Sequence, residues 1–165
     1  MNILRHYTDA IFYHYADFKG RASRSAYWFF GLVYLVLAIA ATLVDILVLG
    51  NLGAIMQGSW LTLVNAYCLV TLLPALAIST RRMHDIGQSG WLQLVYIVPT
   101  LALMLALYFI ISVRFDDLVY LLVFVVIVFF AFIAGAIAFT VLAAMDSQKG
   151  RNQYGPNPKE SGEAA

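Results

Sequence analysis

The sequence predicts an all-α membrane protein: a four-transmembrane-helix bundle preceded by an N-terminal amphipathic interfacial helix. Of its 165 residues, 62% are hydrophobic and 12% are charged, whereas soluble domains are about 45–50% apolar and about 25% charged. The apolar residues also form four runs, and each run meets the roughly 20 residues that a helix needs to cross the hydrocarbon core. Lipid can cover such a surface, whereas water cannot.

The four runs cover residues 26–50, 59–80, 91–113 and 118–145. They are apolar on every side, whereas a membrane β-strand alternates in polarity over about ten residues. Because backbone groups in lipid must bond internally, we expect helices. The short connections suit antiparallel neighbours. Residues 1–158 are therefore expected to form a single membrane domain, and the polar residues 159–165 a disordered tail.

The distribution of Lys and Arg predicts the orientation in the membrane. With four spans, nine of these ten residues lie on one side, in the N-terminal segment, the loop after the second run and the C-terminal tail. The opposite side holds only Arg114. The positive-inside rule then places both termini in the cytoplasm. The net charge of +1 gives no sign of nucleic-acid binding.

An aromatic stripe at helical spacing precedes the first run. Its members are Leu4, Tyr7, Ile11, His14, Tyr15 and Phe18. We expect this helix to lie in the cytoplasmic interface, because Tyr prefers that depth. The alternative is a soluble helix that packs on the loops of the bundle.

Three polar motifs fall on the predicted cytoplasmic side: Lys19–Trp28, Arg81–Trp91 and Gly150–Pro158. Many of their residues have an ordinary structural reading. Glycines at positions 20, 87 and 150 can end helices. Serines at positions 23, 25 and 89 can cap the helices that follow. This reading does not account for the density of hydrogen-bonding groups in the middle motif.

A sharper hypothesis is that seven residues of these motifs converge into one polar cluster: Arg21, Arg24, Arg81, Arg82, His84, Asp85 and Asn152. Asp85 would pair with Arg21 or Arg24 across helices, since a guanidinium group matches a carboxylate or a phosphate. Surplus arginines would attract an anion, and the nearest abundant anion is a phospholipid headgroup. The alternative is a structural pin that joins the loops.

The motifs also resemble a known family. Residues Gly20–Trp28, Arg82–Trp91 and Gly150–Pro158 are similar to the conserved segments of the bacterial inner-membrane family called domain of unknown function 805. Leu92 departs mildly from the pattern, which often has a second aromatic residue there. The resemblance implies a small, multi-pass protein of the bacterial inner (plasma) membrane, and it implies no activity.

Asp45 and Asn65 are polar residues inside the apolar runs. We expect them to join helices, because an ion pathway needs more ionisable groups at mid-depth. No spacing of His, Cys or Asp predicts a metal site or a cofactor. We therefore expect a non-catalytic protein whose partners are membrane lipids, with a homo-oligomer or another membrane protein as a further option. A small transporter or channel component and a membrane-embedded lipid-modifying enzyme stay open as alternatives.

Overall fold

The computed structural model describes residues 3–50, 62–110 and 118–160. These residues form four long helices and three short helical segments, and they contain no β-strand. The long helices are α2 (Arg24–Leu47), α4 (Leu63–Asp85), α5 (Leu94–Ile110) and α6 (Leu118–Ala144). The short segments are α1 (Ile3–Thr8), the π-helical η1 (Asp9–Tyr13) and the 3-10 helix η2 (Gly90–Gln93). The predicted all-α class is confirmed.

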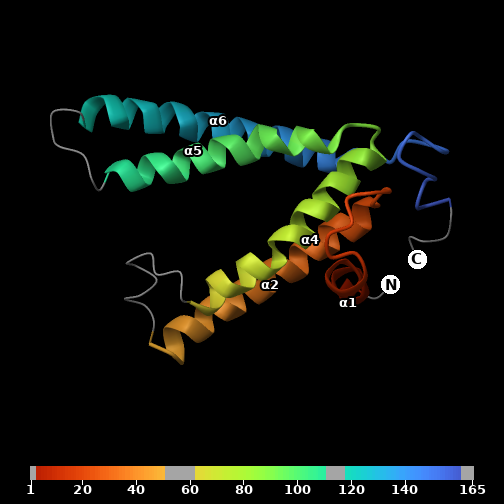
Figure 1. Ribbon diagram of the computed structural model, residues 1–165, viewed down its shortest axis with the longest axis horizontal. Helices are drawn as coiled ribbons and strands as arrows, with labels where there is room; N and C mark the ends of the chain where they lie inside the picture. The colour runs from red at the N-terminus through yellow and green to blue at the C-terminus, as the bar shows by residue number, and fades with distance from the viewer. Residues whose placement is uncertain (1–2, 51–61, 111–117, 161–165) are drawn as a thin grey trace.

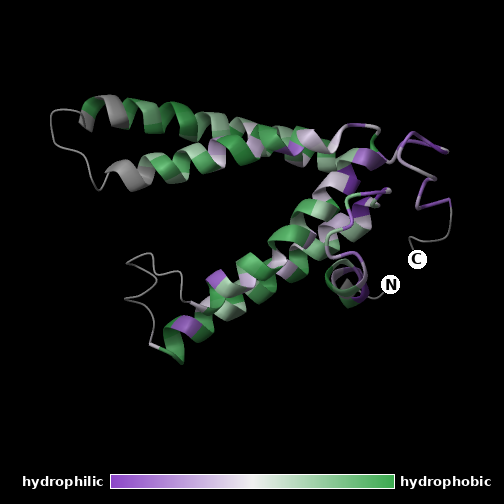
Figure 2. Ribbon diagram, in the orientation of Figure 1, coloured by the Kyte–Doolittle hydropathy of each residue, from purple (hydrophilic) through white to green (hydrophobic). Residues whose placement is uncertain are grey.

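The long helices form two antiparallel pairs that meet at one end and diverge toward the other, so the molecule resembles a V (Figure 1). Helices α2 and α4 make one arm, and α5 and α6 make the other. Hydrophilic residues gather at the end where the arms meet, while the arms are mostly apolar (Figure 2). We call this end the closed end. It also holds α1 and the segment after α6.

The observed arrangement differs from one closed four-helix bundle. At the closed end, Tyr27 of α2 and Met83 of α4 pack against Phe139 and the neighbouring Ala143 of α6. Farther along the arms, large apolar side chains stay exposed; Ile137, for example, is 60% exposed. Exposed apolar residues gain little from closing a bundle in lipid, because lipid tails are as apolar as they are.

Three described helices are long and apolar enough to cross a membrane: α2, α4 and residues 122–144 of α6. The fourth apolar stretch, Gly90–Ala106, is shorter than these. The predicted third span continues to residue 113, and its last three residues lie outside the described part of the chain.

Helix α4 runs five residues past the predicted end of the second span and includes the charged part of the middle motif. The prediction of a loop beginning at Arg81 is therefore wrong. The added part of the helix contains Arg82 and Asp85, which pair at helical spacing. The helix ends at Asp85, two residues before Gly87, which has a φ of 78°. At the other end, α4 begins at Leu63, four residues later than predicted.

Both predicted intramembrane polar residues lie where α2 ends and α4 begins. Asp45 is fully buried, and its carboxylate accepts hydrogen bonds from the backbone amides of Leu63 (3.0 Å) and Val64 (2.9 Å). Thr62 caps the same helix by accepting from the amide of Asn65 at 3.3 Å. These amides have no partner within the helix, and a carboxylate there also faces the positive end of the helix dipole. Asp45 thus ties the first arm together at its open end.

In the second arm, α5 and α6 approach closely at Gly135. A Cβ atom at this position would lie 2.5 Å from the carbonyl oxygen of Val95. Pro99, four residues after Val95, has no amide hydrogen to donate to that carbonyl. Glycine therefore lets the backbone of α6 come up against the carbonyl group that the proline leaves unpaired within its helix.

The N-terminal segment packs across the α2–α4 arm near the closed end (Figure 1). Tyr7 stacks on Phe30 of α2, with ring centroids 5.4 Å apart. The Tyr15 hydroxyl donates a 2.5 Å hydrogen bond to the carbonyl of Val70 in α4. That carbonyl lacks its usual helical donor because Pro74 lies four residues later. The proline thus creates an acceptor that the N-terminal segment fills.

Lys159 and Glu160 of the predicted tail belong to a turn in which the amide of Glu160 donates to the carbonyl of Asn157 at 3.0 Å. The other five residues of that tail lie outside the described residues.

Candidate functional site

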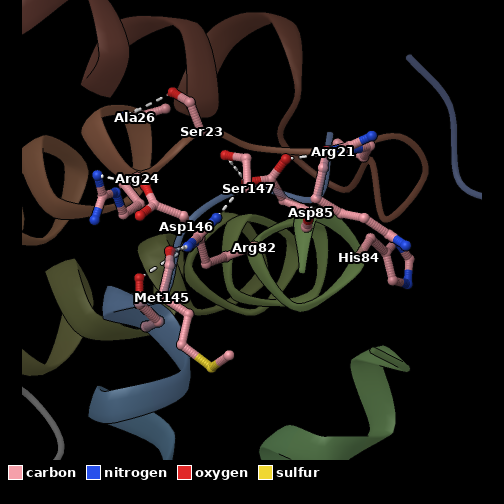
Figure 3. A network of polar contacts seen from close by, with 12 residues as sticks. Arg21, Ser23, Arg24, Ala26, Arg82, His84, Asp85, Met145, Asp146 and Ser147 are labelled. Carbon is pink, nitrogen blue, oxygen red and sulfur yellow. Dashed lines mark hydrogen bonds and ion pairs between the residues drawn. The ribbon is translucent and has the colours of Figure 1, made fainter. Parts of the chain in front are cut away.

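Six of the seven predicted site residues come together at the closed end (Figure 3). They are Arg21, Arg24, Arg82, His84, Asp85 and Asn152, and we call them the polar junction. The seventh residue, Arg81, faces a different pocket.

Asp85, in the last turn of α4, is the centre of the polar junction and is fully buried. Its Oδ1 accepts from Arg21 Nε at 3.0 Å. Its Oδ2 accepts from Arg82 of the same helix and from the hydroxyl of Ser147 at 2.6 Å. One carboxylate therefore joins the segment before α2, the end of α4 and the segment after α6.

Two arginines complete the C-terminal end of α6. The last carbonyls of a helix have no amide partner within it. Here Arg82 donates to the carbonyls of Ala143 (2.9 Å) and Met145, and Arg24 donates to that of Ala144 at 3.1 Å. Cations at this end also interact favourably with the helix dipole. Three consecutive carbonyls are thus satisfied by side chains from two other helices.

Arg21 holds the segment that follows α6. Its side chain is 1% exposed, and it donates to the carbonyls of Gln148 (2.5 Å), Gly150 (2.8 Å) and Gly155 (3.3 Å). It also reaches the backbone carbonyl of Asp85 at 3.2 Å. A guanidinium group offers five donors in a fixed plane, which suits this fan of acceptors.

His84 and Asn152 secure the rim of the junction. His84 Nδ1 lies 3.1 Å from the carbonyl oxygen of Gly20, and its ring stacks on Tyr154 with centroids 3.7 Å apart. Asn152 Nδ2 donates to the carbonyl of His84 at 2.9 Å and to Gln148 Oε1 at 3.0 Å. All three polar motifs of the sequence therefore meet in one network.

The three arginines of the junction all have partners within the protein. Arg21 and Arg82 pair with Asp85, and Arg24 pairs with Asp146 at 2.8 Å. Each of them also donates to at least one carbonyl. A buried ion pair persists when further hydrogen bonds satisfy both partners, as they do here. Every guanidinium group of the junction thus has partners inside the protein, although the three arginines share two carboxylates, those of Asp85 and Asp146.

Arg81 lines a cavity of about 360 Å³, which we call the Arg81 pocket and which Arg21 of the junction also borders. Its polar lining comes mainly from the N-terminal segment: Arg5, His6, Asp9 and His14. The Nε atom of Arg81 is buried and has no hydrogen-bond partner within the described part of the chain. A buried donor of this kind normally has a hydrogen-bond acceptor, so a ligand that supplies an acceptor would complete the site.

The lining of the Arg81 pocket carries a net positive charge. Arg5, Arg21 and Arg81 contribute three positive charges and Asp9 one negative charge, with two histidines beside them. Arg21 is already paired with Asp85, whereas Arg5 and Arg81 are not part of that pair. The carboxylate of Asp9 lies 3.7 Å from His14 Nδ1. A phosphate group would supply both the missing acceptor and the missing negative charge.

Sequence reasoning missed several residues of these sites. Arg5 carries no sequence signal beyond its charge, and His14 none beyond its place in the aromatic stripe. Ser147 and Gln148 lie in no recognisable motif, and no local signal indicates that they reach α4. Within the described ranges, no group of three or more His, Cys, Asp or Glu side chains could hold a metal ion.

These features define an all-helical protein with long apolar helices and an arginine-rich polar junction at one end. Residues 15–156 match the family described as "Protein of unknown function (DUF805)", and the chain belongs to this family, as the three motifs predict. The chain is similar to inner membrane protein YhaH of Escherichia coli (strain K12), with 32% identity over 95 residues, 58% of this chain and 75% of the relative. It is also 34% identical to inner membrane protein YhaI over 95 residues, 58% of this chain and 74% of that relative.

Both relatives are inner membrane proteins, which together with the apolar helices supports the same location for this chain. No solved structure gives a significant match.

Proposed function

We propose that this protein is a non-catalytic, four-pass inner-membrane protein that binds the phosphate of an anionic phospholipid in the Arg81 pocket. The observation that carries the proposal is the buried Nε of Arg81, which has no hydrogen-bond acceptor in the described chain. Arg5 lines the same pocket and adds another cation. The polar junction then acts as the frame that fixes the end of α4, and with it Arg81, in place.

The proposed topology puts the closed end and both termini in the cytoplasm. All nine Lys and Arg residues that the structure describes belong to segments that lie at this end. The anionic surface of the cytoplasmic leaflet attracts such a cluster. A reporter fused after Gln88 is expected in the cytoplasm and one fused after Met56 outside it. A cytoplasmic Met56 fusion would overturn the topology.

The Arg81 pocket suits a headgroup because of its position as well as its charge. Ile78 and Ala26 line it beside the polar groups, so its wall passes from charged to apolar where α2 and α4 enter the apolar part of the arm. A phospholipid makes the same transition from phosphate to acyl chain. Arginine can offer two parallel donors to one phosphate.

The test is lipid retention measured by native mass spectrometry after release from a gentle detergent. Arg81→Gln should lower the retention of phosphatidylglycerol by about tenfold, the size expected for one charge-assisted hydrogen bond. Retention of phosphatidylethanolamine, which carries no net charge, should change much less.

Arg151→Gln is the matched control, because Arg151 is an exposed cation that does not line the pocket. It should leave phosphatidylglycerol retention unchanged. Equal retention by the wild type, Arg81→Gln and Arg151→Gln would contradict the proposal. The same spectra report the number of copies in the complex.

A further inference from the structure

A second cavity at the closed end shares no lining residue with the Arg81 pocket. It has a volume of about 520 Å³ and lies between the end of α4, η2 and the segment after α6. Its walls include the rings of Phe18, His84, Trp91 and Tyr154 together with the polar groups of Thr80 and Gln93. We call it the aromatic pocket.

The aromatic rings are held by contacts that leave ring surface free. His84 and Tyr154 stack almost in parallel, with an interplanar angle of 2°. Trp91 is 76% exposed although it lines the pocket, and Phe18 is 38% exposed. The face of an aromatic ring carries negative electrostatic potential, which attracts cations and disfavours anions.

Two polar side chains of the pocket offer hydrogen-bond acceptors. Gln93 Nε2 donates to Thr80 Oγ1 at 3.0 Å, while Gln93 Oε1 is buried and has no partner among the described residues. His84 Nδ1 faces the carbonyl of Gly20, which can only accept, so Nδ1 carries the hydrogen. In the neutral ring, Nε2 is then an acceptor as well.

None of the described residues that line the pocket is Asp, Glu, Lys or Arg. A ligand that donates hydrogen bonds and favours aromatic faces complements these features, and it meets no fixed positive charge among the described lining residues. An ammonium group meets all of these demands, because it donates in several directions and is attracted to aromatic rings.

We propose that the aromatic pocket binds an ammonium group, which donates to Gln93 Oε1 and lies against the ring of Trp91. At a membrane surface this group can belong to the ethanolamine headgroup of a phospholipid or to a soluble amine. Tryptophan prefers the membrane–water interface, where headgroups of this kind are found. The two pockets would then recognise opposite charges at the same end of the molecule.

The first experiment asks whether an ammonium group is recognised and where it comes from. Nanodiscs of equal parts phosphatidylethanolamine and N-acetyl phosphatidylethanolamine hold the purified full chain, and native mass spectrometry counts the lipids that stay bound. Acetylation removes the positive charge and leaves the chains and the phosphate. In parallel, ethylammonium chloride is titrated into the protein in detergent, followed by tryptophan fluorescence.

Preferred retention of the unmodified lipid supports a headgroup site. Saturable binding of ethylammonium without any lipid preference supports a soluble amine. Equal retention of both lipids together with no response to ethylammonium would overturn the proposal.

The second experiment introduces a negative charge at position 93. Gln93→Glu keeps the shape and adds a carboxylate, so an ammonium ligand should bind about tenfold more tightly, because a charge-assisted hydrogen bond replaces a neutral one. An anion would bind less tightly. Gln93→Leu removes the acceptor and should weaken binding of the ammonium group. Weaker binding to Gln93→Glu than to the wild type would therefore also overturn the proposal.

The third variant tests the ring. Trp91→Leu should weaken binding by about fivefold, the size of a partly exposed cation–π contact. Trp28→Leu is its control, because Trp28 is 45% exposed and lies outside the pocket. Equal effects of the two substitutions would show that the Trp91 ring does not contact the ligand. Since Trp91 is largely exposed, its replacement should leave the unfolding temperature unchanged, and this keeps a loss of binding distinct from a loss of fold.

Discussion

Arg21 Nε lies 3.0 Å from Asp85 Oδ1, and both side chains are essentially removed from solvent. The two residues are 64 positions apart in the sequence. Arg21 precedes the first long helix, and Asp85 is in the last turn of the second. This contact therefore closes the α2–α4 arm at the end opposite Asp45.

Asp85→Asn should destabilise the protein by about 3–5 kcal/mol, the cost of leaving buried charges without their partner. Two arginines lose their carboxylate at once. The measurement is the free energy of unfolding in mixed micelles during a denaturing-detergent titration.

Asp146→Asn is the matched control, since this carboxylate pairs with Arg24 but is 79% exposed. It should cost less than about 1 kcal/mol, as exposed ion pairs do. If the two substitutions cost the same, the polar junction is not the pin that its geometry indicates.

Gly135→Ala should separate α5 from α6 and cost about 1–3 kcal/mol, because overpacked contacts force the backbone to shift. The added Cβ atom would lie 2.5 Å from the Val95 carbonyl oxygen and 3.1 Å from its carbon. Unfolding of the purified variant, followed by circular dichroism, measures the cost.

Gly31→Ala in α2 is the matched control, since its Cβ atom would meet nothing within 4 Å. Alanine also favours a helix more than glycine does. We expect no loss of stability, and a loss as large as that of Gly135→Ala would contradict the close approach.

Tyr15→Phe should cost about 1 kcal/mol and loosen the N-terminal segment, because the Val70 carbonyl loses its donor. Hydrogen exchange in residues 3–18 should rise. Tyr13→Phe should have no effect, because Tyr13 is 79% exposed.

The role of Pro74 makes this prediction specific. Pro74→Ala restores an amide that can donate to Val70, so the effect of Tyr15→Phe should shrink in that background. An unchanged effect would mean that the tyrosine acts through packing alone.

Asp45→Ala should weaken the junction of α2 and α4 by about 1–2 kcal/mol, because two amides of α4 lose their acceptor and the helix dipole loses its counter-charge. Asp45→Asn keeps one acceptor and should cost less. Thermal unfolding in detergent distinguishes the two variants. A larger cost for Asn than for Ala would argue against the capping role.

The sequence predicted the all-α class well, because the bilayer imposes one length and one type of backbone bonding on each apolar run. It also predicted several helix ends. Ser23 caps α2 by accepting from the amide of Ala26, and Gly87 ends the α4 region with a positive φ. These signals are local, since they depend on the chemistry of one or two neighbouring residues.

The V shape could not be predicted in this way. Hydrophobicity shows that a helix can enter lipid, and it carries no information on which helices pair. The same limit applies to the site. The sequence analysis predicted that Arg81 and Arg82 belong to one cluster because they are adjacent in the chain. Adjacent residues of a helix point in different directions, however. The structure therefore places Arg82 inside the polar junction and Arg81 in the lining of a pocket that Arg21 of the junction also borders.

The capping of α6 by Arg82 and Arg24 determines when the polar junction can form during synthesis of the chain. Both arginines leave the ribosome long before the carbonyls of Ala143, Ala144 and Met145 exist. Until synthesis reaches the end of α6, these two cations lack the carbonyl acceptors that they have in the folded protein. The junction can close only on a chain that is nearly finished. A product truncated before α6 lacks these three carbonyl acceptors, although Arg82 can still pair with Asp85.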